Sequence, residues 1–454
     1  MRTACSVAGC PLPMAGRTIG RMEALVDSVT GPATEPAIVP AARPAGPDRC
    51  RFCDAPLSHV VVDLGMSPLC ESFLAADELD RMEPFYPLRT LVCDRCYLVQ
   101  LAQYVSPESI FSEYAYFSSY SDSWVEHARR YAETMRERLG LGPDSLVVEL
   151  GSNDGYLLQH FQAAGIGVLG IEPARNVAAV AIERGIPTEV RFFGRETALD
   201  LVGRGRRADL ICLANVLAQV PDLNDFVAGM AILLAPKGHL TVEFPHLATL
   251  LEHVEFDTIY HEHFSYFSLG TAVRIFAAHG LTIVDVDEIP THGGSLRIHA
   301  RHADVRAPVS TAIGRVLAAE AAAGLEDLAT YSTFGARVEA LKRDLLTFLI
   351  ESRREGRTVV GYGAPGKANT LLNYCGIRTD LVAYTVDRNP YKHGRFTPGT
   401  HIPIHPPERI FEDRPDYVWI MPWNLTPEIT AQLAGIRAWG GRFLVAIPAV
   451  RVIE

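Results

Sequence analysis

Short hydrophobic runs alternate with amphipathic segments through the chain from about residue 145 onward. Each run has the length and the Val, Ile and Leu content of a buried strand, and the intervening segments show helical spacing. Such alternation predicts a mostly parallel, doubly wound sheet. The runs are "SLVVEL" (145–150), "GVLGIE" (167–172), "ADLICLAN" (208–215) and "GHLTVEF" (238–244), with "LTIVDVDEI" and "GGSLRIHAR" predicted as two further strands at the sheet edge.

A second alternating unit follows an Ala-rich helical region at about 311–355. "TVVGYGAPGKANTLLNYCG" predicts a strand, a loop and a helix, and "LVAYTVD", "DYVWIMP" and "RFLVAIP" predict further strands. Upstream, "WVEHARRYAETMRERLGL" predicts a helix that ends near Gly140. We therefore expect an α/β protein with an N-terminal extension (1–48), a cysteine-bearing lobe (49–110), a central Rossmann-like domain (111–310) and a second Rossmann-like domain (311–454).

Composition narrows the classes of function. Of the 454 residues, 48% are hydrophobic and 21% are charged, which is ordinary for a globular protein. The formal net charge of −11 repels phosphate backbones, so nucleic acid is not an expected partner. No apolar run is long enough to span a membrane. The N-terminus lacks the apolar core of a signal peptide, and the nine cysteines are an odd number, so we expect the cytoplasm.

Two CxxC pairs frame the lobe after the Pro- and Ala-rich extension, which we expect to be disordered. Cys50 and Cys53 form one pair and Cys93 and Cys96 the other, and two such pairs can supply a tetrahedral set of thiolates for zinc. Four ligands complete the shell, so this zinc is predicted to be structural. The alternative is four buried cysteines without a metal. The other cysteines are expected in disordered flanks (Cys5, Cys10) or in the core (Cys70, Cys212, Cys375).

The stretch "VVELGSNDGYLL" places glycines and acids between a strand and a helix, where the backbone can approach a ligand. Glu172 ends the next strand, where a carboxylate can bind both ribose hydroxyls. The loop lacks the G-x-G-x-x-G spacing of a pyrophosphate site, so S-adenosylmethionine fits better than NAD. The alternative is a turn without a ligand. The predicted cofactor residues are Glu149, Gly151, Asp154, Gly155, Glu172 and Asn215.

Five segments, taken in order, identify a family resemblance. "IEPARNVAAVA", "ANVLAQVPDLNDF", "DTIYHEHFSYFSL", "THGGSLRIHA" and "GYGAPGKANTLLNYCGI" resemble the S-adenosylmethionine-dependent sugar C-methyltransferases of deoxysugar biosynthesis. The resemblance covers nearly everything from Cys50 to the C-terminus. It implies a nucleotide-linked 4-keto-6-deoxysugar as the acceptor, with carbon 3 as the usual position and carbon 5 open. At Gln219 the family is expected to have a histidine, so a catalytic role for this position is in doubt.

Methylation of a carbon beside a ketone requires an enolate, and therefore a base, donors to the oxyanion and an aligned methyl donor. In "YHEHF" the resemblance assigns the base to His263 rather than His261, which the residues themselves do not separate. Glu262 is expected to orient the imidazole or to bind a sugar hydroxyl, and Tyr260 to donate to an oxygen. A metal held by both histidines and a merely polar loop are the alternatives.

Two further stretches are predicted to bind the substrate. In "YAYFSSYSD" the resemblance directs Tyr116 to the sugar near the reacting carbon, and the hydroxyls that follow can donate to sugar or diphosphate oxygens; a packed aromatic turn is the alternative. "GYGAPGK" is not a P-loop, yet it presents backbone amides and a lysine at a helix start, as an anion site does. A turn used only for packing is its alternative. The predicted substrate residues are Ser118, Ser119, Tyr120, Lys367, Lys392 and Arg395.

Two other classes of function compete with a sugar C-methyltransferase. One is a methyltransferase that acts on another acceptor, such as an amine or a phenol. The other is a zinc-scaffolded binding protein with an inactive core, which the retained cofactor and "YHEHF" residues disfavour. The oligomeric state is expected to be a monomer or a homodimer.

Overall fold

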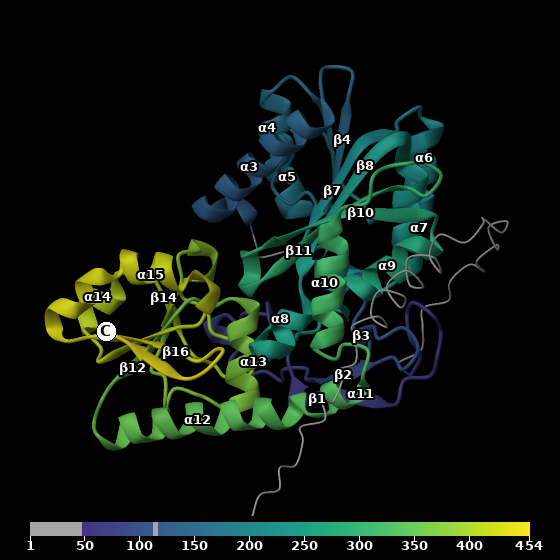
Figure 1. Ribbon diagram of the computed structural model, residues 1–454. Coiled ribbons are helices and arrows are strands. Elements are labelled where there is room, and N and C mark those ends of the chain that lie inside the picture. The colour runs from purple at the N-terminus through teal and green to yellow at the C-terminus, as the bar shows by residue number, and fades with distance from the viewer. Residues whose placement is uncertain (1–47, 112–116) are drawn as a thin grey trace, which may run out of the picture. The chain divides into compact units, whose positions relative to one another are not determined.

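A computed structural model of the chain describes residues 48–111 and 117–454. These residues form three sheets with helices between them (Figure 1). The predicted extension, apart from Asp48, lies outside the described residues, as do Cys5, Cys10, Tyr114 and Tyr116.

The central sheet has seven strands in the order β10-β11-β8-β7-β4-β5-β6. The strands from β6 to β8 pair in parallel, whereas β11 and β10 are antiparallel and lie at one edge. The predicted α/β class and the two edge strands are confirmed. The strands are β4 (Leu146–Leu150), β5 (Gly167–Ile171), β6 (Thr188–Glu189), β7 (Ala208–Ala214), β8 (Leu234–Pro245), β10 (Leu281–Ile289) and β11 (Ser295–His302).

Helices cover this sheet because each buries one apolar face. In α3 (Asp122–Leu139) the buried residues Ala128, Tyr131, Ala132 and Met135 follow helical spacing, and the left-handed Gly140 ends the helix. The other helices of this domain are α4 (Leu158–Ala163), α5 (Arg175–Glu183), α6 (Arg195–Gly203), α7 (Leu223–Leu233), α8 (Leu247–Glu252) and α9 (Leu269–Ala278), with the short 3-10 helices η2 (Ser118–Tyr120), η3 (Leu217–Gln219), η4 (Phe256–Thr258) and η5 (Thr291–Gly293).

The cysteine-bearing lobe contains a sheet in the order β1-β2-β3-β9. The first three strands come from the lobe: β1 and β2 lie between the two CxxC pairs in the sequence, and β3 follows the second pair. The fourth comes from the central part of the chain, directly after "YHEHF", and pairs with β3 through Gln100 and Ser265. The elements are β1 (His59–Ser67), η1 (Ala76–Glu78), β2 (Tyr86–Val92), β3 (Val99–Leu101), α2 (Pro107–Phe111) and β9 (Ser265–Tyr266).

The C-terminal sheet has the order β14-β13-β12-β15-β16-β17. In both large sheets the first strand, β4 or β12, lies in the middle, with the second and third strands on one side and the fourth and fifth on the other. This arrangement creates a switch point at which α/β sheets bind ligands. The elements are β12 (Val359–Tyr362), α13 (Gly366–Cys375), β13 (Thr385–Val386), η6 (Pro390–Lys392), β14 (Ile404–His405), α14 (Arg409–Asp413), β15 (Tyr417–Ile420), η7 (Trp423–Leu425), α15 (Thr426–Gln432), η8 (Ala434–Trp439), β16 (Arg442–Val445) and β17 (Arg451–Ile453).

Three helices connect the central and C-terminal sheets: α10 (Thr311–Ala322), α11 (Leu328–Ser332) and α12 (Phe334–Arg354). In Figure 1, α12 runs from beside β1 to the C-terminal sheet. Its buried residues belong to one hydrophobic cluster that also contains Val61 of β1 and Leu372 of α13. The lobe and the C-terminal domain therefore share a core through α12.

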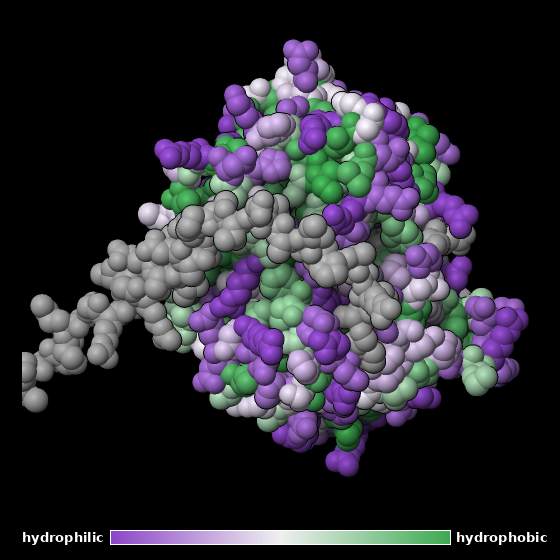
Figure 2. All heavy atoms as spheres, turned by 90° about the vertical axis from the view of Figure 1, so that its right-hand side faces the viewer, coloured by the Kyte–Doolittle hydropathy of each residue, from purple (hydrophilic) through white to green (hydrophobic). Residues whose placement is uncertain are grey.

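Where the described residues are visible in Figure 2, hydrophilic side chains surround small separate groups of hydrophobic ones. Within residues 48–111 and 117–454, no helix has the length and apolar character that crossing a membrane requires.

Candidate active site and zinc centre

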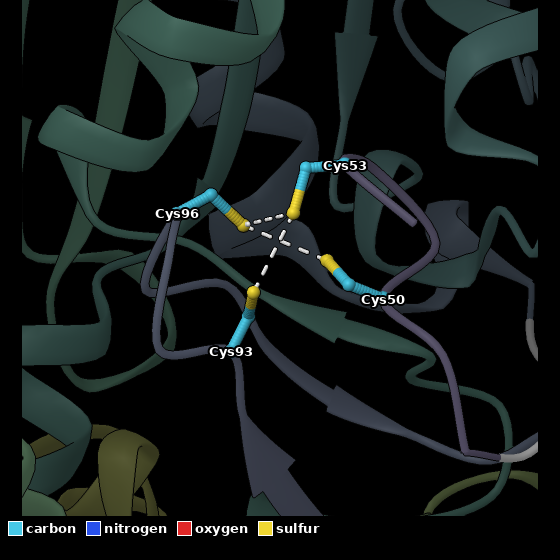
Figure 3. A group of neighbouring side chains, drawn as sticks. All are labelled: Cys50, Cys53, Cys93 and Cys96. Carbon is cyan, nitrogen blue, oxygen red and sulfur yellow. Dashed lines mark hydrogen bonds between the residues drawn. The ribbon is translucent and has the colours of Figure 1, made fainter. Parts of the chain in front are cut away.

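The four predicted zinc ligands lie together. The sulfur atoms of Cys50 and Cys96 are 3.5 Å apart, those of Cys53 and Cys93 are 3.5 Å apart, and all four ligand atoms lie within 4.8 Å of one another. Figure 3 shows the thiols of two separate loops pointing toward a common centre. Four sulfurs at about 2.3 Å from a tetrahedral zinc would be about 3.8 Å apart, so these residues fit the metal.

Neighbouring polar groups support this geometry. Gln100 donates from its side-chain amide to the Cys50 sulfur at 3.2 Å, and the Arg95 backbone N–H donates to the Cys93 sulfur at 3.4 Å. Among the described residues, this quartet is the one group of three or more His, Cys, Asp or Glu placed to hold a metal, so the structure gives no support to a metal at His261 and His263.

A cavity of about 590 Å³ brings together residues of the lobe, the central domain and the C-terminal domain. Its walls are formed by the ends of β5, β7 and β8, the "YHEHF" stretch and the start of α13. The predicted site residues that line it are Ser118, Tyr120, Gly151, Glu172, Asn215, Tyr260, Glu262, His263, Lys367 and Lys392. Ser119, Glu149, Asp154, Gly155 and Arg395 do not line it.

Glu172 lines the cavity and fixes the backbone on either side of it. Its carboxylate accepts hydrogen bonds from the backbone N–H of Asn153 at 2.9 Å and of Ala174 at 2.8 Å. Burial raises the pKa of Glu172 to about 7, although these two bonds favour the ionised form. The carboxylate thus holds the glycine loop against the second strand and still faces the cavity, as a group that binds ribose hydroxyls must.

The glycine loop is shaped by close packing. Gly151 has a φ of 68°, and a Cβ there would lie 2.5 Å from Val216. Asp154 is buried and accepts hydrogen bonds from the Ser119 hydroxyl and, at 3.3 Å, from the Ser119 backbone N–H. Arg184 approaches the same carboxylate at 3.5 Å. Asp154 and Ser119, which we predicted to bind different ligands, therefore fix the entry to α3 against the loop.

Glu149 lies below the cavity rather than in its wall. Its side chain is fully buried, and burial raises the pKa of Glu149 well above its usual range. Tyr156, which lines the cavity, lies beside the Glu149 carboxyl group and favours its ionised form.

The two histidines of "YHEHF" face different surroundings. His263 lines the cavity, and its Nδ1 lies 3.0 Å from the Thr258 carbonyl oxygen. A carbonyl only accepts, so Nδ1 carries the proton and Nε2 has a free lone pair. His261 is buried outside the cavity, with Nε2 3.2 Å from the Pro87 carbonyl oxygen. The structure therefore separates two residues that the sequence could not.

The neighbours of His263 are an aromatic ring and an acid. The Tyr260 ring lies 4.0 Å from the imidazole at 35°. Glu262 accepts a hydrogen bond from the Cys70 thiol at 3.4 Å. Burial lowers the pKa of His263 to about 4, so the imidazole is neutral near pH 7, as a base must be.

The C-terminal domain contributes cations to the wall of the cavity. Lys367 donates to the Asn424 side-chain oxygen at 2.8 Å and lies over the Trp423 ring at 4.6 Å. Lys392 is buried and donates to the Ala364 carbonyl at 2.8 Å. Arg395 instead donates to the Tyr391 and Phe73 carbonyls at 3.1 and 3.4 Å, away from the cavity.

The start of α13 already holds an anion from the chain itself. A carboxylate oxygen of Glu71 lies against Gly366, 3.3 Å from where a Cβ on that glycine would be, and the carboxylate lies 3.5 Å from the Lys392 ammonium. A carboxylate at a helix N-terminus is stabilised by the free N–H groups and the helix dipole. Glu71 therefore lies beside the start of α13, where a diphosphate contact was predicted.

Comparison with known proteins agrees with this arrangement. Three family models match in order: "Putative zinc binding domain" over residues 50–111, "Methyltransferase domain" over 124–286 and "C-methyltransferase C-terminal domain" over 290–448. The chain is 38% identical over 407 residues to the C-methyltransferase NovU of Streptomyces niveus, a match that covers 90% of this chain and 97% of that protein.

The chain belongs to the S-adenosylmethionine-dependent C-methyltransferases.

This C-methyltransferase also matches proteins that share less of its length. It is 31% identical over 106 residues to a ubiquinone biosynthesis O-methyltransferase of Methylobacterium sp. (strain 4-46), covering 22% of this chain and 41% of that protein. The structure of magnesium protoporphyrin IX methyltransferase from Synechocystis PCC 6803 with bound S-adenosylmethionine is 17% identical, with a TM-score of 0.30 over 39% of this chain and 81% of that one. The predicted methyl donor and the zinc centre are confirmed by the family models and the thiol geometry.

Sequence reasoning missed several residues of this C-methyltransferase site. Arg388 lines the cavity, and its guanidinium lies 3.6 Å from Glu428 and 3.7 Å from Asp122. Its position after Asp387, at the carboxyl end of a predicted strand, is the signal that could have identified it. Glu71 had no local signal, because its role depends on α13, far along the sequence.

Proposed function

We propose that this C-methyltransferase transfers the methyl group to the carbon beside the ketone of a nucleotide-linked 4-keto-6-deoxysugar, with carbon 3 as the expected position. One observation carries the proposal: a single cavity is lined by Glu172 of the central domain, by His263, and by Lys367 and Arg388 of the C-terminal domain. An acceptor with a small reacting part and a long anionic part suits such a cavity.

We assign the chemical step to an enolate formed by His263. Its Nδ1 is engaged by Thr258, so Nε2 is the atom that can take a proton from the substrate carbon. Tyr260 and Glu262 lie in the same wall and supply groups for the sugar oxygens. Tyr116, predicted to reach the sugar near the reacting carbon, lies outside the described residues.

We assign the donor to the end of the cavity formed by Gly151, Glu172 and Asn215. The Glu172 carboxylate retains acceptor capacity beyond its two backbone bonds, since each oxygen has two lone pairs. The S-adenosylmethionine ribose hydroxyls can donate to it. Asp154 and Gly155 contribute by shaping the loop, and Glu149 is buried beside Tyr156.

We assign the nucleotide diphosphate to Arg388 and Lys367. Arg388 is half exposed and its two carboxylate partners are no closer than 3.6 Å, so its guanidinium can turn toward a phosphate. Lys392 is held by Ala364 and Glu71 and is expected to position α13 instead. Ser118 and Tyr120 also line the cavity.

The decisive experiment is mass spectrometry of a panel of nucleotide 4-keto-6-deoxysugars incubated with the enzyme and S-adenosylmethionine. A mass gain of one methyl group, with the position located by NMR, supports the proposal. Methylation of amines or phenols with none of the keto sugars would favour the competing acceptor class. We expect the reaction to take place in the cytoplasm, in a monomer or a homodimer.

A further inference from the structure

The loop "THGGS" between β10 and β11 brings a second imidazole to the cavity. His292 lines the same cavity as His263. Its backbone has a φ of 55°, a left-handed conformation that non-glycine residues rarely adopt, and the next two glycines have φ values of 96° and 142°. A histidine in this rarely adopted conformation indicates that its side chain has a role in the cavity.

The surroundings fix the His292 ring. The Trp124 indole meets it edge to face at a centroid distance of 5.2 Å and an angle of 89°. Its neighbour Thr291 donates to the Glu243 carboxylate at 2.9 Å, and Arg297 donates to the same carboxylate at 2.9 Å. The loop is therefore tied to β8 and β11 on either side of the imidazole.

The hydrogen bond of His292 determines its tautomer. The Asn215 side-chain nitrogen lies 3.3 Å from His292 Nδ1. With the Asn215 amide nitrogen assigned as the donor, Nδ1 is the acceptor and the proton of the neutral ring resides on Nε2. In His263 the Thr258 carbonyl imposes the opposite tautomer. The cavity thus contains one imidazole with a free lone pair and one with an N–H group to donate.

We propose that His292 is a catalytic hydrogen-bond donor: its Nε2–H binds the ketone oxygen of the acceptor and stabilises the enolate oxygen that forms there. The inference deepens the proposed function and rests on it. His263 and His292 line the same cavity from different loops, and a ketone bound between them would meet the base at its carbon and the donor at its oxygen.

The step balances in atoms and electrons. The C–H bond beside the ketone breaks, its proton goes to His263 Nε2, and its electron pair forms the C=C bond of the enolate while the carbonyl π pair moves to oxygen. The enolate carbon then forms a bond to the methyl group as the methyl–sulfur bond breaks and its pair stays on sulfur. The ketone reforms, and His263 releases its proton to solvent.

Neutrality of both rings suits these roles. Burial, together with the charges of Lys367 and His127 and against that of Glu243, lowers the pKa of His292 to about 4. A neutral imidazole N–H is an established type of donor to a carbonyl that becomes an enolate. A protonated His292 would instead lower the basicity of His263, because each positive charge disfavours the other.

The test uses His292→Asn, because Asn tolerates the left-handed backbone and its side chain ends where Nδ1 lies, short of Nε2. We expect its kcat to fall by about 10²–10³-fold, the usual loss for one oxyanion donor. The affinity for S-adenosylmethionine should be unchanged by calorimetry. Exchange of the hydrogen beside the ketone in deuterium oxide, with S-adenosylhomocysteine bound, should slow in parallel. Infrared difference spectra should lose the carbonyl shift of the bound ketone.

Two further measurements keep the inference testable. His292→Gly removes the side chain without backbone strain, and added imidazole should restore part of its turnover. ¹⁵N NMR of the parent, with the His292 signals identified by their absence in His292→Asn, should show the proton on Nε2. A parental kcat in His292→Asn, a carbonyl shift retained in it, or a proton on Nδ1 overturns the inference. A parent that methylates none of the keto sugars refutes the proposed function instead, and the ¹⁵N spectrum still decides the tautomer.

Discussion

The loops that follow β4 and β12 are held by acids in equivalent positions of two different domains. After β5, the Glu172 oxygens accept from the backbone N–H groups of Asn153 at 2.9 Å and Ala174 at 2.8 Å. After β13, the Asp387 oxygens accept from those of Ala364 at 2.7 Å and Asn389 at 2.8 Å. In each case a carboxylate at the end of the second strand ties down the loop that follows the first.

The difference lies at the helix that follows. Both loops line the cavity, but in the C-terminal domain the start of α13 also lies against the Glu71 carboxylate, which Lys392 accompanies at 3.5 Å. The same fold can therefore face a cofactor in one domain and an internal anion in the other. The chemistry is expected in the central domain, and the C-terminal domain is expected to position the acceptor.

The largest expected effect follows from replacing the base. His263→Gln should lower kcat by about 10²–10⁴-fold, the usual contribution of a general base, because an amide cannot take the proton. Steady-state methyl transfer measures kcat, and unchanged S-adenosylmethionine binding by calorimetry shows that the site is intact. His261→Gln is the matched control outside the cavity and should cost far less. Near-parental turnover by His263→Gln would show that His263 is not the base.

The two clamping acids should differ in what they affect. Glu172→Ala should weaken S-adenosylmethionine binding by about 1.5–3 kcal/mol, or about 10–150-fold, since a charged hydrogen-bond acceptor is lost. Asp387→Ala removes the equivalent clamp and should leave donor affinity unchanged in the absence of acceptor. Calorimetric titration of both variants tests the comparison. Equal losses of affinity would show that both domains bind the donor. Unchanged affinity in both variants would show that the ribose is bound by other residues.

Donor binding should depend on pH through Glu172. Burial raises its pKa to about 7, so the carboxyl group of the free enzyme is half protonated near pH 7. The ribose hydroxyls favour the ionised form, so affinity should rise with pH and protons should be released on binding near pH 7. We expect about a tenfold gain between pH 6 and pH 8, the limit for a single ionisation of this pKa. Glu172→Gln should lose this dependence; a profile unchanged by the substitution would contradict the assignment.

Folding should respond to the same ionisation with the opposite sign. The pKa of Glu172 is raised in the folded state, so its contribution to stability is fully present below the unfolded value of about 4.3 and is lost as pH rises through about 7. Thermal unfolding of parent and Glu172→Gln without ligand should therefore diverge as pH increases, with the variant relatively more stable at high pH.

The smallest effect is expected in the C-terminal domain. Arg388→Ala should raise KM for the nucleotide sugar about threefold to tenfold and leave kcat nearly unchanged, because a half-exposed ion pair is worth ~1 kcal/mol. Added salt should raise the parental KM and narrow the difference. A fall in kcat without a change in KM would place Arg388 in the chemical step and break the division between the domains.

Local patterns predicted much of this molecule. The strands of both large sheets are runs of consecutive apolar residues, and short runs of this kind are typical of strands that are buried on both faces. The zinc ligands were predictable because two CxxC pairs carry their own geometry. The position of Glu172 was predictable for a different reason: the end of the second strand has a defined place in this fold.

What the sequence left open depends on side-chain direction and on distant contacts. His261 and His263 are of the same type in the same stretch, and only the folded backbone directs one of them into the cavity. Glu71 reaches α13 across almost three hundred residues, so no window of sequence contains the pair. The strand β9 has two residues, too few for an alternating pattern.

That two-residue strand has a consequence for how the protein is made. Val99 and Gln100 of β3 pair with Tyr266 and Ser265, so the lobe remains one strand short until the ribosome has added more than 160 further residues. Until then β3 has an open edge, and open edges pair readily with other chains. A fragment that ends before Ser265 should therefore aggregate even with zinc in place, whereas one that continues through β9 should protect that edge.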